Sequence, residues 1–487
     1  MPYRVILAVG FLLLAVGCSE RPDAEFEPLT PENTLKVALE AELIPVVTIE
    51  GDPSTGRTLD ERRQDALVNS VSIAVFQGGV FDWADAYGPG ADTSKLYQAA
   101  SLSKTVASAT LLTYAKERGV DFDQDLRPAL RDIGGLDLDI LNPIDVPITL
   151  RKLLSHTNGA SVGGFPGYAA GEVIPTNLQV VTGDSLANTK PVVFSPIEDG
   201  ERRYSGGGYQ LAQLWAETVS GEEFAALAER LVFEPIGIER ATFAINLIQE
   251  GYSVDEIAAG HGWDGQPMDG GWHRYPESAA AGLWITPEDY GRFVLALMQA
   301  YGGDASAGLD VDVAQAMMVP IAKEYGLGVG VETRDGILRI RHSGWNENFR
   351  AYFMGVPAEG DVIVTMVDSA RGMQLSGDIN RTANRIYGWP TSEPRREAML
   401  ALSDAKLASY AGDYVIEGNT DTAFTLSVDS PFLRFTTPSG YAYRYVPIGE
   451  NLFIDPDDGE ELVLEKRDDI WTVEDNGTVY VRRGASG

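Results

Sequence analysis

The sequence contains one cysteine, Cys18, and only four histidines among its 487 residues. Without a second cysteine no intramolecular disulfide can form, so the fold depends on its hydrophobic core alone. The single cysteine also excludes cysteine-ligated zinc, and the histidines are not at metal-ligand spacing. We therefore expect no metal site and no cofactor.

Basic residues are scarce, because 38 lysines and arginines stand against 71 acidic residues, and the formal net charge is -33. Such a field repels phosphates, so nucleic acid is not an expected partner, and charge does not attract the chain to an anionic lipid surface. The acidity indicates a solvated surface, with cation binding as the alternative. A hydrophobic content of 44% argues against disorder,.

Long apolar runs are also scarce, but one covers residues 5–17 after Arg4. It is too short to span a bilayer comfortably and is typical of a signal peptide, which we assign to residues 1–17. Ala15–Gly17 before Cys18 resembles a bacterial lipobox, which implies that Cys18 is lipidated,. The chain is then a lipoprotein on the periplasmic side of the bacterial cell envelope, in the outer membrane, and contacts the membrane through its lipid anchor only. The alternative is an ordinary secretory signal with an incidental Cys18.

A chain of this length exceeds what one core usually serves, which predicts one large and one small domain. Residues 18–57 are expected to form a lipid-anchored spacer and extension, because the segment 20–33 is acidic and lacks apolar periodicity,. A capping-box pattern at 58–61 precedes a helix, so we expect the folded part to begin at Thr58,.

The large domain is predicted to span residues 58–390 and to be of the α+β class, an antiparallel sheet flanked by helices. Residues 71–87 alternate around Gly78-Gly79 like a β-hairpin, and further strands are expected at 336–342, 349–356 and 362–367,. Between them the segment 121–332 is mostly helices and loops, so the sheet is assembled from its two ends around a helical insertion. A linker is expected at 391–404, followed by a small β-barrel-like domain at 405–487 built of short strands,.

Ser101 and Lys104 lie three residues apart at the predicted start of a helix, so their side chains share one face,. A serine hydroxyl needs a base, and a lysine can serve if burial or a nearby cation lowers its pKa toward neutrality. The pair alone is a weak motif that chance can supply. A surface helix turn is the alternative.

Two later segments add to this pair. Tyr204 stands in a glycine-rich turn before an amphipathic helix, where a neighbouring ammonium would acidify its phenol for proton relay,. The alternative is a packing tyrosine. The segment 341–345, Arg-His-Ser-Gly-Trp, lies between two predicted strands, where its glycine lets a substrate approach the sheet,.

Taken in order, Ser-x-x-Lys, a Tyr-Ser turn and His-x-Gly on a strand resemble the serine β-lactamase-like family. That family includes class C β-lactamases, D-Ala-D-Ala peptidases, D-amino-acid peptidases and esterases. Similar blocks at 71–75, 148–159, 233–237 and 280–289 extend the resemblance over residues 59–390.

The resemblance implies that Ser101 is the acylated nucleophile and that Lys104 and Tyr204 share the proton transfers. It also implies an oxyanion hole made by the N–H groups of Ser101 and Trp345, where each donor is worth about 3 kcal/mol in acyl transfer. The implied substrate-binding residues are His342, Ser343, Gly344 and Gly206.

Two departures from the family pattern bear on the substrate. Gly206 replaces an asparagine common in relatives, so a substrate-binding amide is missing unless Asn158 or another group supplies it. His342 replaces the lysine of β-lactamases and is largely neutral at pH 7, although Arg341 or Arg350 would restore a positive charge,.

Both changes favour esters, small amides or short peptides over penicillins as substrates. β-Lactamase or D-Ala-D-Ala carboxypeptidase activity, or a non-catalytic receptor for cell-wall fragments, are the alternatives. His156 is expected to belong to a structural turn.

Replacing Cys18 with alanine tests the anchor. Without the acyl chains nothing should hold the protein to the bilayer, so we expect it to move from the membrane fraction to the soluble periplasm. Fractionation followed by immunoblotting measures the change. Membrane association that persists unchanged in the variant would contradict the assignment.

Overall fold

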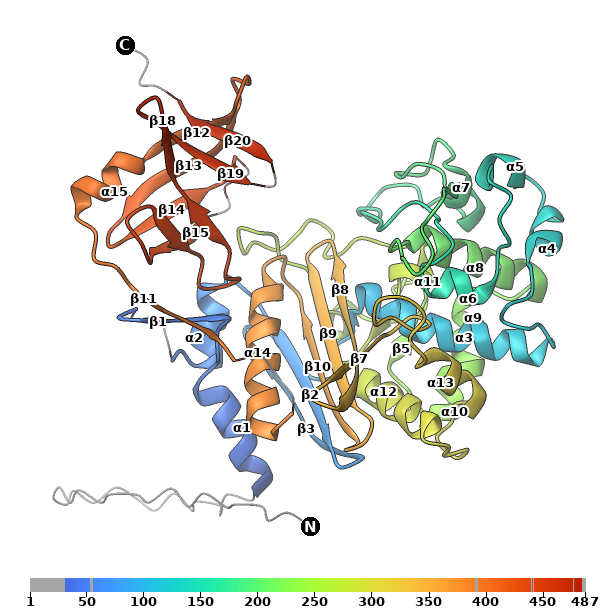
Figure 1. Cartoon of the computed structure of the whole chain (residues 1–487). Coiled ribbons are helices and arrows are strands. Elements are labelled where there is room, and N and C mark those ends of the chain that lie inside the picture. The colour runs from blue at the N-terminus through green and yellow to red at the C-terminus, as the bar shows by residue number, and fades with distance from the viewer. Residues whose placement is uncertain are drawn as a thin grey trace.

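The computed structural model describes residues 31–52, 56–389, 393–438, 440, 442–475 and 477–483. The expected signal peptide and Cys18 lie outside these residues. Figure 1 shows a main α+β region joined to a C-terminal β region, which comprises residues 404–483. No helix within the described part of the chain combines the length and apolarity needed to cross a membrane.

An antiparallel six-stranded sheet forms the centre of the main region, in the order β3-β2-β10-β9-β8-β7. Its strands are β2 (Val71–Gln77), β3 (Val80–Tyr87), β7 (Gly330–Arg334), β8 (Ile337–Asn346), β9 (Phe349–Val356) and β10 (Asp361–Val367). Two strands precede the helical insertion, as predicted, and four follow it, where the sequence pattern predicted three. The additional strand is β7, which begins inside the segment expected to hold mostly helices and loops. The α+β class is therefore confirmed.

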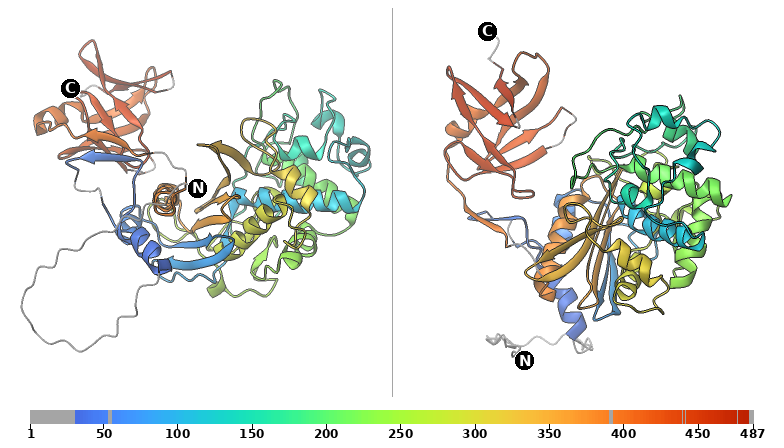
Figure 2. Two further views of the ribbon diagram at one scale, coloured as in Figure 1. Left: turned by 60° about the horizontal axis from the view of Figure 1, so that its bottom comes forward. Right: turned by 45° about the vertical axis from the view of Figure 1, so that its right-hand side comes forward.

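Helices cover both faces of this sheet. Helix α12 (Pro287–Tyr301) packs on β2 and β10 from the side of the insertion, and α14 (Gly372–Tyr387) packs on β9 and β10 from the other side (Figure 2). The remaining elements of the insertion are β4 (Tyr97–Gln98), η1 (Ala100–Leu102), α3 (Ser103–Glu117), α4 (Arg127–Arg131), α5 (Leu138–Leu141), α6 (Leu150–Leu154), α7 (Asn177–Thr182), α8 (Gly206–Ser220), α9 (Phe224–Ala228), η2 (Glu229–Phe233), α10 (Glu234–Ile236), β5 (Ala241–Thr242), η3 (Val254–Glu256), α11 (Ser278–Ala281), β6 (Trp284–Ile285) and α13 (Val311–Met317).

Folded structure begins well before Thr58, so the predicted start is wrong. Helix α1 (Pro31–Ala41) lies against α14, and its Leu39 is fully buried in a cluster with Leu375. The following strand β1 (Val47–Glu50) pairs in parallel with β11 (Arg395–Ala398) inside the predicted linker. Sequence patterns cannot reveal this pairing, because Val47 and its partner Arg395 are 348 positions apart in the chain.

The capping box at Thr58 is confirmed. Thr58 Oγ1 accepts from the Glu61 N–H at 3.2 Å, and Glu61 Oε2 accepts from the Thr58 N–H at 2.9 Å. These bonds satisfy two N–H groups at the start of α2 (Leu59–Asp65), which carries Arg62 toward the C-terminal β region,.

The C-terminal β region is one curled antiparallel sheet, ordered β17-β16-β15-β14-β13-β12-β20-β19-β18. Its two outermost strands are joined through Leu464, so the sheet closes nearly into the predicted barrel, around Leu407 and Tyr410 of α15. The elements are α15 (Asp404–Tyr410), β12 (Gly412–Ile416), β13 (Thr422–Asp429), β14 (Phe432–Thr436), β15 (Ala442–Pro447), β16 (Leu452–Ile454), β17 (Glu461–Val463), β18 (Glu465–Arg467), β19 (Ile470–Asp475) and β20 (Thr478–Arg482).

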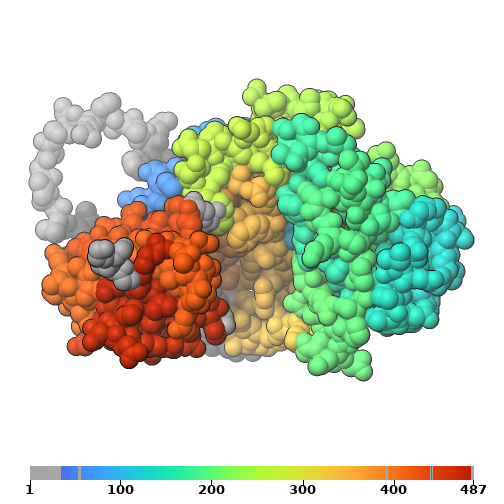
Figure 3. All heavy atoms as spheres, turned by 90° about the horizontal axis from the view of Figure 1, so that it is seen from above, coloured from blue at the N-terminus to red at the C-terminus, as the bar shows by residue number. Residues whose placement is uncertain are grey.

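Ion pairs hold the C-terminal β region beside the main region (Figure 3). Arg62 donates to Asp378 on α14 at 2.8 Å and to Asp457 of the β region at 2.7 Å. Arg444 forms a two-bond pair with the nearly fully buried carboxylate of Asp52, at 3.1 and 2.9 Å. Such forked pairs fix orientation as well as distance.

Truncating Leu39 tests whether α1 belongs to the core. Leu39→Ala removes buried methyl groups and leaves a cavity, so it should lower the free energy of unfolding by about 2–4 kcal/mol. Val37→Ala is the matched control, because Val37 lies on the same helix and is 49% exposed. Denaturant unfolding measures both variants. An equal loss of unfolding free energy in the two variants would contradict the packing of α1 into the core.

Candidate active site

Ser101 lies in the tight turn η1, immediately before α3, rather than in the first turn of the helix as predicted. The preceding residue, Ala100, is fully buried and has a φ of 50°. A residue with a Cβ rarely adopts this left-handed conformation, and such strain concentrates at functional sites. The kinked backbone presents Ser101 beside the first turn of α3.

Lys104 is buried directly behind Ser101. Its Nζ lies 3.1 Å from Ser101 Oγ and donates to the Ala280 carbonyl at 2.7 Å. No carboxylate pairs with it among the described residues, and burial lowers the pKa of Lys104 to about 7. A large share of the molecules therefore carries a neutral amine at neutral pH, as proton abstraction from Ser101 requires. Ala280 has no sequence signal of its own, because it acts through its backbone.

Tyr204 contacts both members of this pair. Its side chain is hydrogen-bonded to Ser101, and its ring centroid lies 5.0 Å from Lys104 Nζ. Burial raises the pKa of Tyr204 to about 12, so the predicted acidification of this phenol is wrong. The physical reason is that burial disfavours the charged phenolate, and Lys104, with a pKa of about 7, carries only part of its positive charge near pH 7,. Tyr204 is therefore a proton donor at neutral pH.

His156 holds the segment that carries Tyr204. The two rings are 4.4 Å apart, and His156 Nδ1 accepts a hydrogen bond from the Ser205 N–H at 3.1 Å. Ser205 then caps α8 by accepting from the Gly208 N–H at 2.9 Å. Burial holds the pKa of His156 well below its usual range, so the ring is neutral. This supports a structural role, and shows that the role is to orient Tyr204.

His342 is buried and neutral, and both of its ring nitrogens are engaged. Nδ1 lies 2.7 Å from the Ser343 carbonyl and must donate to it, so Nε2 accepts from the Tyr325 hydroxyl at 3.0 Å. Burial and the nearby Lys104 lower the pKa of His342 to about 3. It presents no positive charge to a substrate. Tyr325 has no motif in the sequence and becomes visible only through this contact.

Gly344 lets β8 approach η1. A Cβ on Gly344 would lie 2.5 Å from the Ala99 carbonyl oxygen, which no side chain tolerates without a backbone shift. The close approach packs β8 against η1, an arrangement that the implied oxyanion hole of Ser101 and Trp345 requires,. Ser343 and Trp345 are exposed, and Trp345 keeps 58% of its surface accessible.

Gly206 is buried at the start of α8 and has no room for a side chain. A Cβ there would lie 2.7 Å from a ring carbon of Phe165. An asparagine at this position would therefore displace Phe165, which explains the departure from the family pattern. Asn158 is buried nearby, and within the described chain its Nδ2 has no hydrogen-bond partner. Asn158 Nδ2 lies 3.6 Å from where a Cβ on Gly208 would stand, so this buried donor is close to the first turn of α8.

The two arginines that flank this segment are used in the fold. Arg341 lies 3.3 Å from the carboxylate of Glu332. Arg350 donates to the carbonyls of Asn346 and Phe349 at 2.7 Å each, and its guanidinium lies 3.7 Å from the Trp345 ring. Neither arginine replaces the charge that His342 lacks. Among the described residues no group of three or more histidines, cysteines or acidic residues is placed to hold a metal ion.

A family model described as Beta-lactamase matches residues 56–385. A curated relative, the unguisins hydrolase of Aspergillus violaceofuscus, is 25% identical over 306 residues, which cover 54% of this chain and 52% of the relative. The chain thus spans about half the length of that protein.

Solved structures of other proteins share the fold, and two of them illustrate the likeness. One is the octameric penicillin-binding protein homologue from Pyrococcus abyssi, with a TM-score of 0.54, 16% identity and coverage of 87% of this chain and 98% of that one. The other is the D-amino acid amidase from Ochrobactrum anthropi, with a TM-score of 0.54, 17% identity and coverage of 73% and 98%.

Replacing Lys104 with methionine tests the buried amine. The pKa of Lys104 is about 7 in the folded state, against an ordinary value of 10.5. The unfolded chain therefore binds more protons between these values, and wild-type stability rises with pH across this window. Lys104→Met has no amine to titrate. The free energy of unfolding of the variant minus that of wild type should therefore fall by about 2–4 kcal/mol from pH 7 to pH 10. Denaturant unfolding of both proteins measures the difference, from which other titrations cancel. A difference independent of pH would contradict the lowered pKa.

Proposed function

The chain belongs to the Beta-lactamase family of serine hydrolases, and on this premise we propose that it hydrolyses esters or small amides and peptides through an acyl-enzyme at Ser101. One observation carries the proposal, the 3.1 Å contact between Ser101 Oγ and the buried, carboxylate-free Nζ of Lys104. A base with a pKa of about 7 next to a serine is what nucleophilic catalysis at neutral pH requires,.

In the acylation step, neutral Lys104 takes the proton from Ser101 Oγ as the oxygen attacks the substrate carbonyl. The N–H groups of Ser101 and Trp345 stabilise the resulting oxyanion. Tyr204, a proton donor by its raised pKa, delivers a proton to the leaving group, and Lys104 returns one to Tyr204. The carbon–leaving-group bond then breaks and leaves an ester on Ser101.

In the deacylation step, water takes the place of the leaving group. The same base removes a proton from the water, the oxyanion forms again in the same place, and Ser101 leaves as the alcohol. Both half-reactions therefore use one base, one donor and one pair of N–H groups.

The polar groups around Ser101 favour substrates that carry no charge next to the scissile carbonyl. His342 is uncharged and fully engaged with Tyr325 and Ser343, so it offers little attraction to the carboxylate that penicillins carry. Relatives whose names include amidase and hydrolase support acyl transfer to water. β-Lactamase or D-Ala-D-Ala carboxypeptidase activity remains the second candidate, because the serine, lysine and tyrosine of that chemistry are together. A receptor for cell-wall fragments abstracts no proton, so it would not need a lysine that is buried at the free-energy cost of removing an ammonium from water.

We also propose that the enzyme works at the bacterial cell envelope as a lipoprotein, anchored through Cys18 on the periplasmic side of the outer membrane. The support is the signal-like segment 1–17 and the position of the only cysteine directly after it,. Its partners are then small-molecule or short-peptide substrates, without nucleic acid.

Labelling with a fluorophosphonate and with a fluorescent penicillin tests the nucleophile. Intact mass spectrometry should find one adduct per wild-type chain and none on Ser101→Ala. Turnover of a reactive ester by Ser101→Ala should fall by about four to six orders of magnitude. Ser103→Ala, two residues along the chain, is the matched control and should keep its adduct. Absence of a Ser101-dependent adduct with both probes would overturn the proposal.

The same preparation separates the candidate substrates. Rates with nitrocefin, short-chain p-nitrophenyl esters and D-amino-acid amides are compared at equal concentration. Esters or amides should be turned over faster than nitrocefin. A preference for nitrocefin would favour the β-lactamase alternative.

A further inference from the structure

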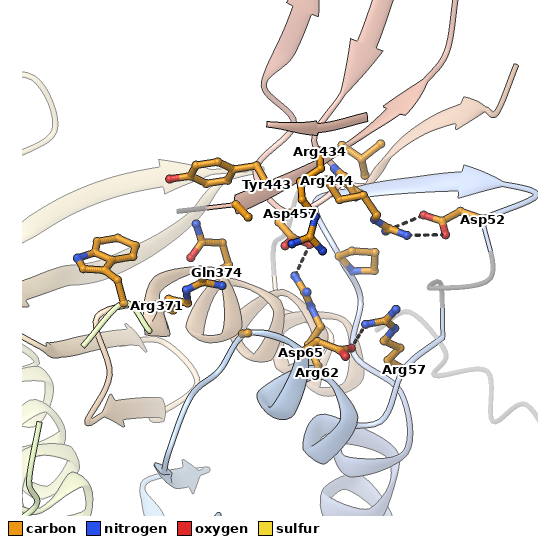
Figure 4. A pocket seen from close by; sticks show the side chains of 16 residues that line it. Asp52, Arg57, Arg62, Asp65, Arg371, Gln374, Arg434, Tyr443, Arg444 and Asp457 are labelled. Atoms are coloured by element: carbon orange, nitrogen blue, oxygen red, sulfur yellow. Dashed lines mark hydrogen bonds and ion pairs between the residues drawn. The ribbon is translucent and has the colours of Figure 1, made fainter. Parts of the chain in front are cut away.

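A cavity of about 350 Å³ lies between the main region and the C-terminal β region (Figure 4). Arg371, Gln374 and Trp263 line it from the main region, and Arg434, Tyr443 and Arg444 line it from the β region. Neither region forms this cavity alone, so its shape depends on the ion pairs that hold the two together.

The cavity lining is positive, although the chain as a whole has a net charge of -33. Five arginines and three aspartates line it. Figure 4 shows the aspartates on one side, where each already has a partner: Asp65 pairs with Arg57, Asp457 with Arg62, and Asp52 with Arg444. Arg434 on the β region faces Asp429 at 3.4 Å.

Arg371 is the lining arginine that takes part in none of these ion pairs. Its guanidinium has no hydrogen-bond acceptor or ion-pair partner among the described residues, and its Nε is shielded from solvent. It stands at the start of the 16-residue helix α14, whose first N–H groups receive no side-chain cap. The positive end of a helix adds to the potential that an anion would meet here.

Two tryptophans connect the cavity to the active site. Trp263 lines the cavity, and its ring centroid lies 6.2 Å from that of Trp345, which follows Gly344 on β8. The backbones of His261 and Ser369 form a parallel β-bridge. Trp263 follows His261 by two residues and Arg371 follows Ser369 by two residues, so both come shortly after the same bridge. Arg350 supports the exposed Trp345 ring from below at 3.7 Å. The side chain of Trp345, whose N–H belongs to the implied oxyanion hole, is thus linked through the Trp263 ring to the cavity.

We propose that this cavity is a substrate subsite that binds a carboxylate or similar anionic group at the far end of the substrate. Arg371 and Gln374 bind the anionic group, and the rings of Trp345 and Trp263 carry the apolar chain between it and the scissile bond. The inference rests on the proposed function, because it names the substrate class for Ser101. It also assigns the C-terminal β region a role, since Arg434, Tyr443 and Arg444 supply part of the cavity lining.

Matched ester series test the subsite. The first series consists of mono-p-nitrophenyl esters of dicarboxylic acids from glutaric to dodecanedioic acid. In these esters the free carboxylate lies on the acyl side, at increasing distance from the scissile bond. The neutral counterparts carry a methyl ester in place of that carboxylate. A second series places the carboxylate on the leaving group of acetate esters. One chain length in one series should be preferred over its neutral counterpart by about 10- to 100-fold in kcat/KM, as a charge-assisted contact gives.

Arg371→Gln should remove this preference and leave the neutral esters unchanged, which also shows that the variant is folded. Arg371→Lys should retain part of it. Arg131→Gln is the control, because Arg131 lies in an exposed pair with Asp139 on the helical insertion and should behave as wild type. No preference at any length in either series, or a preference that Arg371→Gln keeps, would overturn the inference while the proposed function stands.

A binding arm is independent of catalysis. Calorimetric titration of suberate into Ser101→Ala should give saturable binding that is lost in Ser101→Ala/Arg371→Gln, and 1,8-octanediol should not bind. If no ester shows Ser101-dependent hydrolysis, the proposed function fails but this titration still decides the cavity. Equal suberate binding by both variants, or none by either, would overturn the subsite.

Discussion

The site depends on one constraint, the burial of Lys104 without a carboxylate partner. Removing an ammonium from water is expensive, and the protein avoids most of that expense by shifting the pKa to about 7,. The Ala280 carbonyl and Ser101 Oγ are then the two acceptors that orient the amine. A carboxylate beside Lys104 would stabilise the ammonium and end its use as a base. Activity therefore requires a local loss of stability, which the surrounding core must offset.

Several backbone features serve the same constraint. The left-handed Ala100 turns Ser101 toward the amine, and Gly344 allows β8 to approach within contact of the turn. His156 orients Tyr204 through the Ser205 N–H. These contacts come from η1, α8 and β8, which are far apart in the chain. The strain at Ala100 persists because the elements packed around it leave no alternative conformation.

Much of this could be predicted from the sequence. The hairpin β2-β3, the capping box at Thr58 and the short β-favouring runs of the two large sheets carry short-range patterns that survive folding,. Ser101, Lys104 and Tyr204 could be named because their order and motifs resemble a known family. The helix α1 and the β1-β11 pair could not, because a short apolar stripe and a pairing across the whole chain give no local signal. Tyr325 and Ala280 were invisible for a related reason, since each acts through a contact made only by tertiary packing.

The sequence by itself determined the residue types of the site and the periodicity of its helices and strands. Tertiary structure decided their charge states. Burial made Lys104 a base near pH 7, kept Tyr204 protonated and neutralised His342. It also decided that Gly206 has no room for an asparagine, because Phe165 fills that space. The physical reason is the same in each case: a pKa and a steric limit depend on which atoms replace water around a group, and that is set by residues distant in the chain.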